Sequence, residues 1–472
     1  MLRDCLPSSV RRTLNELPES LDETYERILK EIKKPNRDIA QRVLQCLVAA
    51  TRPLRVSELA EVLAVDFNDV EGIPRLNPDW RWEDQEQALL IACSSLIAIV
   101  EAGDVEASDS DSDIEGSDGA SGVEAGHDHL EAETNDGNPH IETDDSRIVQ
   151  FSHFSVKEFL TSPRLATASG DVSNYHIDLE PAHTILAQAC LGVLLQTRGD
   201  VEGRTPDNHP LARYAAEHWA THAQFGEVSS RLHKGMECLF DANKPHFKAW
   251  LAIYDIDTYP SDYSTFHAFV LYPKTPATPL YYAALCGFHD LVGLLTTKKP
   301  QDVNADGGWH VRPLLAALAG EHFQTVDFLR HNGADLHVRR GRFGTNPLHA
   351  AAFSGKFDVV RKLIEYDPSD VNARDDNGFT PLIWASGGRH FKDTSVPRFL
   401  LDHGADINAQ DQLGRTPLHR ASYIGALEVV RLLLEHGADV EVKGNDGMTA
   451  FQEAAEEGHD EVVKLLREHG AK

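Results

Sequence analysis

The residue types that most often carry chemistry, cysteine and histidine, stand at spacings that point to no catalytic or metal centre. No two of the six cysteines lie within forty residues of each other, so the chain has no C-x-x-C zinc or redox motif. We expect reduced, chemically idle thiols in a cytoplasmic or nuclear protein. The pair His127 and His129 falls far short of the four ligands of a zinc site. No metal or cofactor is therefore expected.

Two further kinds of active site were sought in the sequence. The phosphate-binding pattern G-x-x-x-x-G-K-[ST], whose backbone amides cradle a nucleotide, does not occur in the chain. His153 has no aligned nucleophile or carboxylate nearby in sequence to make it a general base. We therefore interpret His153 as a structural residue at a strand–helix junction, and we expect no catalytic residues and no enzyme activity.

The charge of the chain excludes two classes of partner. Its 472 residues carry 74 acids against 45 bases, a net charge of −29. Affinity for nucleic acids and for anionic membranes rests on Lys and Arg, so neither is expected to be a partner. The longest nearly apolar run, residues 88–100, is shorter than the roughly 20 residues that span a bilayer.

The negative charge is concentrated in one segment. Residues 101–145 hold sixteen acids and no Lys or Arg. Such a composition cannot bury enough apolar surface to offset its ordering entropy, which predicts a disordered insert over residues 101–147. The apolar runs 96–100 and 148–151 on either side favour two strands, so the insert is expected to interrupt a hairpin.

The acidic insert has two interpretations. In the first it is a solvated spacer. In the second it is a site of regulatory phosphorylation, because Ser108, Ser110 and Ser112 each have an acid three residues on, as acidophilic kinases prefer. Each phosphate would add a charge of about −1.5 to −2.

The segment before residue 160 has the pattern of a winged helix. Apolar residues recur at helical spacing over 14–32, 39–48 and 84–93, and Ser57 is the expected N-cap of a helix over 58–64. Short helices followed by a hairpin make the winged-helix order. Because the wing would carry the sixteen acids, we expect it to pack against protein and not to bind DNA.

Helical patterns continue from residue 161 to about 260. Apolar stripes mark helices over 182–195, 210–223 and 231–240. Trp219 and Trp250 fall on such stripes and are expected in the hydrophobic core. The sequence thus predicts a winged-helix-like region over 1–160 and a helical region over 161–260.

The remaining part carries an internal repeat. Pro279, Pro313, Pro347, Pro381 and Pro417 follow each other at intervals of 34, 34, 34 and 36, and Ala450 takes the same position 33 residues later. Thr commonly precedes this position and caps a helix, and Pro fits the first turn because its φ is preset. Glycines recur where helices end. One repeat cannot bury its own faces, so stability must come from stacking.

This pattern resembles the ankyrin repeat. The family signature T-P-L-H is complete at Thr416-Pro417-Leu418-His419, and Asn346-Pro347-Leu348-His349 differs in one letter. The resemblance covers residues 277–472 and implies about six repeats, with His349 and His419 forming hydrogen bonds between repeats. Glu453, Glu456 and Glu457 in the last repeat imply a capping repeat whose polar face meets water.

The N-terminal region resembles the segment that follows the nucleotide-binding domain in fungal NACHT proteins, which are NLR-like signal-transduction NTPases of the STAND group. The resemblance rests on LPESLDETYERIL at 17–29 and SHFSVKEFL at 152–160. Joined to ankyrin repeats, it implies a NACHT–ankyrin protein that lacks its nucleotide-binding domain. Such a chain would be either a truncated gene model or a genuine relative without the NTPase.

Two functions follow from these patterns. We expect a mainly α protein, a winged-helix and helical region followed by an ankyrin α-solenoid, that acts as a non-enzymatic scaffold for a protein or peptide. The alternative is the C-terminal sensor half of a nucleotide-switched NACHT receptor. The oligomeric state is left open. The expected binding residues lie at turn tips and exposed ends of first helices on the concave face, and several are aromatic, aliphatic or Arg side chains that repeat packing does not need. They are Trp309, Arg342, Phe343, Phe353, Phe379, Gln412, Leu413, Arg415, Tyr423, Ile424 and Met448.

Overall fold

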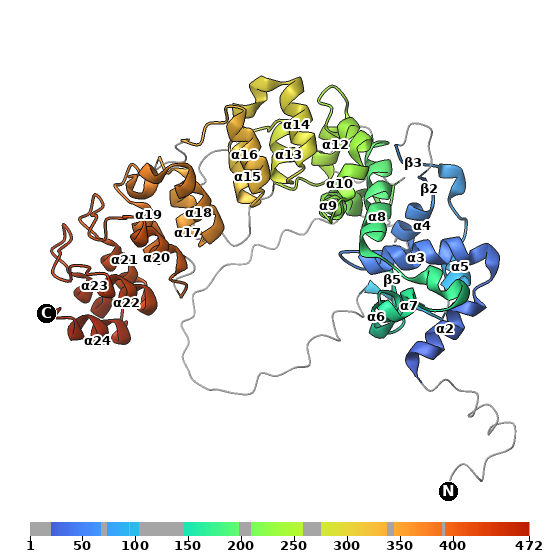
Figure 1. Cartoon of the computed structure of the whole chain (residues 1–472), viewed down its shortest axis with the longest axis horizontal. Helices are drawn as coiled ribbons and strands as arrows, with labels where there is room; N and C mark the ends of the chain where they lie inside the picture. Colours follow the sequence, from blue (N-terminus) through green and yellow to red (C-terminus); the bar gives the residue numbers. More distant parts are fainter. Residues whose placement is uncertain are drawn as a thin grey trace, which may run out of the picture. The chain divides into compact units, whose positions relative to one another are not determined.

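The chain consists of two compact units, Met1–Ile256 and Asp257–Lys472, each described here by itself (Figure 1). The computed structural model describes residues 20–67, 73–93, 95–102, 146–197, 209–257, 275–337, 344–388 and 392–471. Over these residues the chain is mainly helical with few strands, and its second unit is a row of helix pairs. The expected mainly α fold ending in a solenoid is confirmed.

The first unit combines helices with short strands. The helices are α2 (Leu21–Glu31), α3 (Arg37–Ala49), α4 (Val56–Leu63), α5 (Gln85–Cys93), α6 (Phe154–Leu160), α7 (Pro163–Ala166), α8 (Leu179–Leu194), α9 (Ala212–Ala223), α10 (Val228–Arg231), α11 (His233–Leu239) and α12 (His246–Ile253). The strands are β1 (Leu54–Arg55), β2 (Val65–Asp66), β3 (Arg75–Leu76), β4 (Ile97–Glu101) and β5 (Arg147–Phe151). Short 3₁₀ turns are η2 (Lys34–Asn36), η3 (Pro78–Trp80) and η5 (Gly170–Tyr175).

A three-stranded antiparallel sheet of order β1-β5-β4 lies against the helices α3 and α4. Strands β4 and β5 pair in register from Ile97 with Phe151 to Glu101 with Arg147. The hairpin predicted from the two apolar runs is therefore confirmed. The residues between 102 and 146, which include most of the predicted insert 101–147, lie outside the described residues.

Helix α8 is the centre of the first unit. It packs against α3 on one side and α9 on another, and α10 and α11 also contact it (Figure 1). Trp219 and Trp250 are fully buried, with ring centroids 5.3 Å apart, as expected of core residues. The division of the sequence at residue 160 stays a prediction.

Two predicted helix starts had different outcomes. His153 is the N-cap of α6, where its ring nitrogen accepts a hydrogen bond from the backbone N–H of Ser155, so its structural role at a strand–helix junction is confirmed. Ser57 is not an N-cap, because α4 begins one residue earlier. The carboxylate of the buried Glu58, within α4, instead accepts a hydrogen bond from the backbone N–H of the N-cap residue Arg55 at 2.8 Å.

The second unit consists of six helix pairs, which follow one another in Figure 1 from α13 to α24. The first helices are α13 (Pro279–Leu285), α15 (Pro313–Ala319), α17 (Pro347–Phe353), α19 (Pro381–Ser386), α21 (Pro417–Tyr423) and α23 (Ala450–Glu456). The second helices are α14 (His289–Lys298), α16 (Phe323–His331), α18 (Phe357–Tyr366), α20 (Ser395–Asp402), α22 (Leu427–Glu435) and α24 (Asp460–Glu468). The 3₁₀ turns η7 (Pro300–Asn304) and η8 (Pro368–Asn372) follow α14 and α18.

Five of the six described first helices begin as the repeat pattern predicts, whereas α15 follows Arg312, which makes no side-chain capping hydrogen bond. The side chains of Thr278, Thr380, Thr416 and Thr449 accept a hydrogen bond from the backbone N–H three residues on. Asn346 does the same at α17. Only local sequence is needed for this, because a cap and its donor lie within one turn.

Successive repeats are joined by packing and by hydrogen bonds. First helices pack against each other from α13 to α15 and from α17 through α19 and α21 to α23, and second helices pack in the pairs α14 with α16, α18 with α20 and α22 with α24. An asparagine side chain links neighbouring turns: Asn372 donates to the backbone oxygen of Gly404 at 2.9 Å and accepts from the N–H of Asp406 at 2.8 Å. Asn304 makes the equivalent pair of bonds two junctions earlier, between the first and second repeats.

A polar cluster joins α16 to α18. The hydroxyl of Tyr366 donates to Asp327 at 2.6 Å, and the guanidinium of Arg330 lies 4.0 Å from the centre of the Tyr366 ring. Lys362 forms an ion pair with the same Asp327 at 3.4 Å. The Tyr366 hydrogen bond and then Lys362 hold the pKa of Asp327 below its usual value.

Replacing Tyr366 with Phe should weaken the stack at this junction. The ring and its contact with Arg330 remain, but Asp327 loses a charge-assisted hydrogen bond at a partly exposed site, so we expect a loss of about 1 kcal/mol in the unfolding free energy of the second unit. Urea denaturation followed by hydrogen exchange in α16 and α18 measures it. Tyr423→Phe, at a side chain 43% exposed, is the matched control and should change nothing measurable. Equal effects of the two variants would contradict the prediction.

Candidate functional site

Several predicted binding residues meet in an aromatic cluster built by the third and fourth repeats. Phe353, at the end of α17, stands edge to face with Trp384 of α19, with ring centroids 5.7 Å apart. Phe379, in the turn before α19, tilts against the same indole at 5.3 Å. Phe353 and Phe379 had been predicted from the sequence, whereas Trp384, which joins them, had not. All three side chains are half-buried.

An aspartate in the turn fixes the cluster. One carboxylate oxygen of Asp375 accepts from the backbone N–H groups of Asn377 and Phe379, both at 2.9 Å. Its other oxygen accepts from the indole N–H of Trp384 at 3.1 Å. Asp375 thereby holds both aromatic residues in place, and its own charge is fully engaged.

Arg420 of α21 extends this cluster into the fifth repeat. Its guanidinium lies 5.7 Å from the centre of the Phe379 ring. Burial, with Arg415 acting in the same direction, lowers the pKa of this guanidinium. Sequence reasoning missed both Arg420 and Trp384. The sequence carries no clear signal for them, because the equivalent positions Tyr282 and Ala316 in other repeats are buried packing residues.

Arg415 and Glu453 form a second, neighbouring group. Asp411 fixes the turn before α21 by accepting from the N–H groups of Leu413 and Arg415, both at 2.8 Å. The Arg415 side chain then lies between Glu453, 3.0 Å away, and Asp446, 3.4 Å away. The predicted binding residue Arg415 is thus already paired within the repeats.

The expectation that Glu453 faces water in a capping repeat is wrong. Glu456 and Glu457 are exposed, as expected of a capping repeat, but Glu453 is only 3% exposed and does not meet water. Neither carboxylate oxygen has an aligned hydrogen-bond donor among the described residues. Burial raises the pKa of this carboxyl to about 6, although the charge of Arg415 opposes the shift.

The most exposed predicted residues lie on the same repeats. Leu413, at the tip of the turn before α21, is 57% exposed, and Tyr423, at the end of α21, is 43% exposed. The side chain of Gln412 is exposed too, but it donates to the backbone oxygen of Asp376 at 2.6 Å and so links two turns. Leu413 and Tyr423 are the apolar groups on these repeats that face solvent most fully.

The other predicted residues do not join this group. Ile424 and Met448 are half-buried. Trp309 belongs to the turn before α15, where its backbone N–H donates to Asp257 at 2.8 Å. Arg342 and Phe343 lie outside the described residues, as do His127, His129 and the candidate phosphorylation sites Ser108, Ser110 and Ser112.

The histidines of the repeat signature are structural. His349 is 1% exposed, and its Nε2 lies 3.1 Å from the backbone oxygens of both Ala373 and Phe379 in the next repeat. His419 reaches the oxygen of Met448 in the same way at 3.3 Å. The predicted hydrogen bonds between repeats are confirmed, and burial lowers the pKa of both imidazoles.

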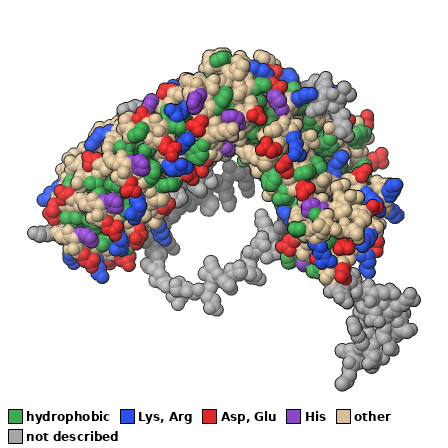
Figure 2. Space-filling view, in the orientation of Figure 1, with side chains coloured by type: hydrophobic (Ala, Val, Ile, Leu, Met, Phe, Trp, Pro, Cys, Tyr) green, Lys and Arg blue, Asp and Glu red, His purple; other side chains and the backbone are tan. Residues whose placement is uncertain are grey.

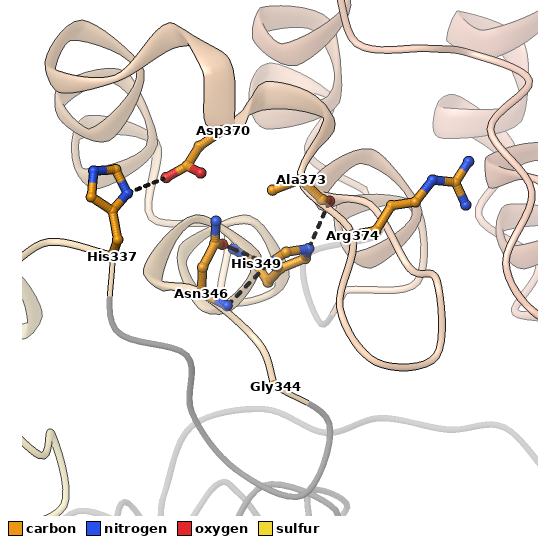
Figure 3. Close-up of a pocket in the computed structure, with 7 residues that line it drawn as sticks. All are labelled: His337, Gly344, Asn346, His349, Asp370, Ala373 and Arg374. Carbon is orange, nitrogen blue, oxygen red and sulfur yellow. Dashed lines mark hydrogen bonds and ion pairs between the residues drawn. The ribbon is translucent and has the colours of Figure 1, made fainter.

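A small cavity of about 140 Å³ lies beside His349 (Figure 3). His349 and Asn346 on one wall are bonded to each other, and His337 on the other lies 3.8 Å from Asp370. The polar groups of the wall therefore have partners of their own, and the cavity is small for a metabolite. It presents no reactive constellation.

Metal-ligating side chains do not gather in the part of the chain that the structure describes. Over those residues no cluster of three or more His, Cys, Asp and Glu suits a metal ion. Burial raises the pKa of the thiols of Cys46 and Cys93 to about 12, which keeps them unreactive. No described helix has the length and hydropathy of a bilayer crossing. On the face seen in Figure 2, acidic and basic side chains are interspersed.

Comparison with known proteins agrees with the repeat geometry. The family model for ankyrin repeats (three copies) matches residues 314–411 and 389–472. A fungal relative, azaphilone pigments biosynthesis cluster protein L of Monascus ruber, is 29% identical over 68% of this chain and 61% of its own length.

Two further relatives match shorter stretches. Ankyrin repeat and SOCS box protein 5 of Mus musculus is 30% identical over 31% of this chain and 42% of its own length. The probable 26S proteasome regulatory subunit p28 of Saccharomyces cerevisiae is 33% identical over 18% and 37%. The chain thus spans less than two thirds of each of these relatives. Its C-terminal part consists of ankyrin repeats, a type of unit that binds other proteins.

Proposed function

We propose that this protein is a non-enzymatic scaffold that binds a protein or peptide through one surface of its ankyrin repeats. That surface, called here the inner-helix surface, is formed by Phe353, Phe379, Trp384, Leu413, Arg420 and Tyr423. The observation that carries the proposal is the exposure of Leu413 and Tyr423 next to a half-buried cluster of aromatic residues and Arg.

This composition is typical of binding hot spots. Trp, Tyr and Arg are enriched among the residues whose replacement by Ala reduces the binding free energy most. Such residues cluster where a partner can exclude water. The second helices of the same repeats carry mainly charged residues outward, with i,i+3 pairs such as Arg431 with Glu428 at 3.5 Å. A partner therefore gains more by covering the first helices and turns than by covering the second helices.

A phage-displayed library of random 12-residue peptides, panned on the full chain, tests this function. We expect enriched peptides whose binding weakens at least fivefold when Leu413 and Tyr423 are both replaced by Ala. The matched control replaces Glu428, Arg431 and Lys464, exposed on the second helices α22 and α24, by Ala and should bind as the native chain does. If no peptide is enriched, or if both variants bind equally, the proposed surface is wrong.

The alternative function is the sensor half of a nucleotide-switched NACHT receptor. The arrangement of α3, α4 and α5 with the β1-β5-β4 sheet supports a winged-helix region in the first unit, as that resemblance implies. An in-frame phosphate-binding loop in genomic DNA about 200–300 codons upstream of Met1 would favour the receptor. A stop codon directly upstream would favour the scaffold.

A further inference from the structure

Arg420 stands out on the inner-helix surface because no described carboxylate pairs with it directly, although Asp411 and Glu453 act on its charge from a distance. Among the described residues its guanidinium makes no hydrogen bond and no ion pair. It lies over the face of the Phe379 ring in a cation–π contact. The nearest turn carboxylates are already engaged: Asp375 binds Trp384 and two backbone N–H groups, and Asp411 binds two backbone N–H groups. A half-buried guanidinium whose five N–H donors lack acceptors is poised to pair with an anion.

The side chain of Arg420 is held in one direction. It lies against Gly387, where an added Cβ would come within 2.8 Å of both its Cγ and Nε. The stem therefore lies against the fourth repeat, while Glu453 is paired by Arg415. Arg420 is already partly desolvated and held in place. Binding an anion therefore costs less side-chain conformational entropy than it would at a mobile Arg.

From this geometry we propose that the inner-helix surface binds an extended peptide segment in which an Asp or Glu side chain pairs with Arg420 and an adjacent apolar side chain lies against Trp384 and Phe353. The inference rests on the proposed function and names the chemistry of its partner. Phe379 joins the two subsites, because it contacts both the guanidinium and the indole.

A carboxylate fits this position better than a phosphate. One guanidinium can bind one carboxylate through two parallel hydrogen bonds. Asp411 and Glu453 are close enough to influence the charge of Arg420, and Asp446 lies on the same repeats. These acids would repel a dianionic phosphate more strongly than a monoanionic carboxylate. The peptide ligand should therefore be acidic at one position and apolar beside it.

The test uses the same phage library on the native full chain, followed by synthetic peptides. We expect the enriched sequences to share an Asp or Glu next to an aromatic or aliphatic residue. By fluorescence anisotropy, changing that acid to Asn or Gln should weaken binding to the native chain about tenfold. Against Arg420→Met, which keeps the stem packed on Gly387, the acid and amide peptides should differ less than twofold.

Arg431→Met is the matched control, because Arg431 lies on α22 and is 45% exposed. It should leave the preference for the acidic peptide unchanged. The proposal is overturned if the enriched peptides lack a common acid, or if Arg420→Met weakens the acid and amide peptides equally. In either case peptides that still lose binding in the Leu413 and Tyr423 variant would leave the proposed function standing.

Discussion

Replacing Glu61 with Ala should destabilise the first unit by about 3 kcal/mol, because a buried backbone N–H loses its acceptor and a charge-assisted hydrogen bond is lost. Glu61, on α4, is only 2% exposed. One of its carboxylate oxygens accepts from the backbone N–H of Leu211 at 2.7 Å, and the other contacts Arg81 and His209. Alanine leaves a buried N–H without its acceptor and removes the ion pair between Arg81 and Glu61.

The measurement must separate the two units, because unfolding of a chain with two units need not be two-state. Hydrogen exchange in peptides covering α4 and α9, followed through a urea series, reports on the first unit alone. Glu61→Gln keeps an acceptor for the backbone N–H of Leu211. It should therefore reduce the unfolding free energy of the first unit less than Glu61→Ala does. The exposed Glu158→Ala on α6 is the control and should stay within about 0.5 kcal/mol of the native chain. A similarly small loss for Glu61→Ala would mean that this contact does not hold α4 to α9.

The first unit should also lose stability in mild acid because of a buried histidine. His222 is fully buried, with its Nδ1 2.8 Å from His183 and its Nε2 2.8 Å from the hydroxyl of Tyr214. Burial, and then the charges of His183 and His218, lower the pKa of His222 to about 3. Burial also lowers the pKa values of His183 and His218.

The sign of the effect follows from where the proton binds. Unfolded His222 takes up a proton near its ordinary pKa of 6.5, while the folded form stays neutral down to about 3. The contribution to stability is therefore complete above pH 6.5 and is lost as the pH falls toward 3. At pH 5 the loss from this residue alone amounts to about 2 kcal/mol.

A variant isolates this contribution. His222→Gln keeps hydrogen-bonding groups but cannot take up the proton, so between pH 7 and pH 5 its unfolding free energy should fall by about 2 kcal/mol less than that of the native chain. The exposed His233→Gln is the control and should follow the native pH dependence. Parallel curves for His222→Gln and the native chain would refute the assignment. Hydrogen exchange in α8 and α9 is again the measurement.

Much of the fold was predictable because it depends on patterns of residues that are close together in the sequence. The Thr and Asn caps, the first-turn prolines and the 33- to 36-residue period each depend on residues within one repeat. The β4–β5 hairpin was predictable from two apolar runs, although a long acidic segment separates them. Cap placement failed at Ser57 because a carboxylate within α4, and not a residue before it, satisfies the helix start.

Tertiary structure alone decided which side chains form sites. The sequence placed Phe353, Phe379 and Arg415 among the binding residues, but only packing between repeats showed that Trp384 joins the two phenylalanines and that Arg415 is already paired. Glu453 reads as a water-facing residue of a last repeat, yet Arg415 from the preceding repeat lies against it in a buried position.

Composition and period determined by themselves that this chain is acidic, that its charge is concentrated in one insert, and that it ends in ankyrin repeats, because those features are sums or local repeats. What they could not determine is the pairing of charges over long separations. Glu61 binds an amide 150 residues away, and Arg420 lacks any such partner among the described residues. Electrostatic pairing depends on distance and burial in the folded chain, which only the tertiary structure sets.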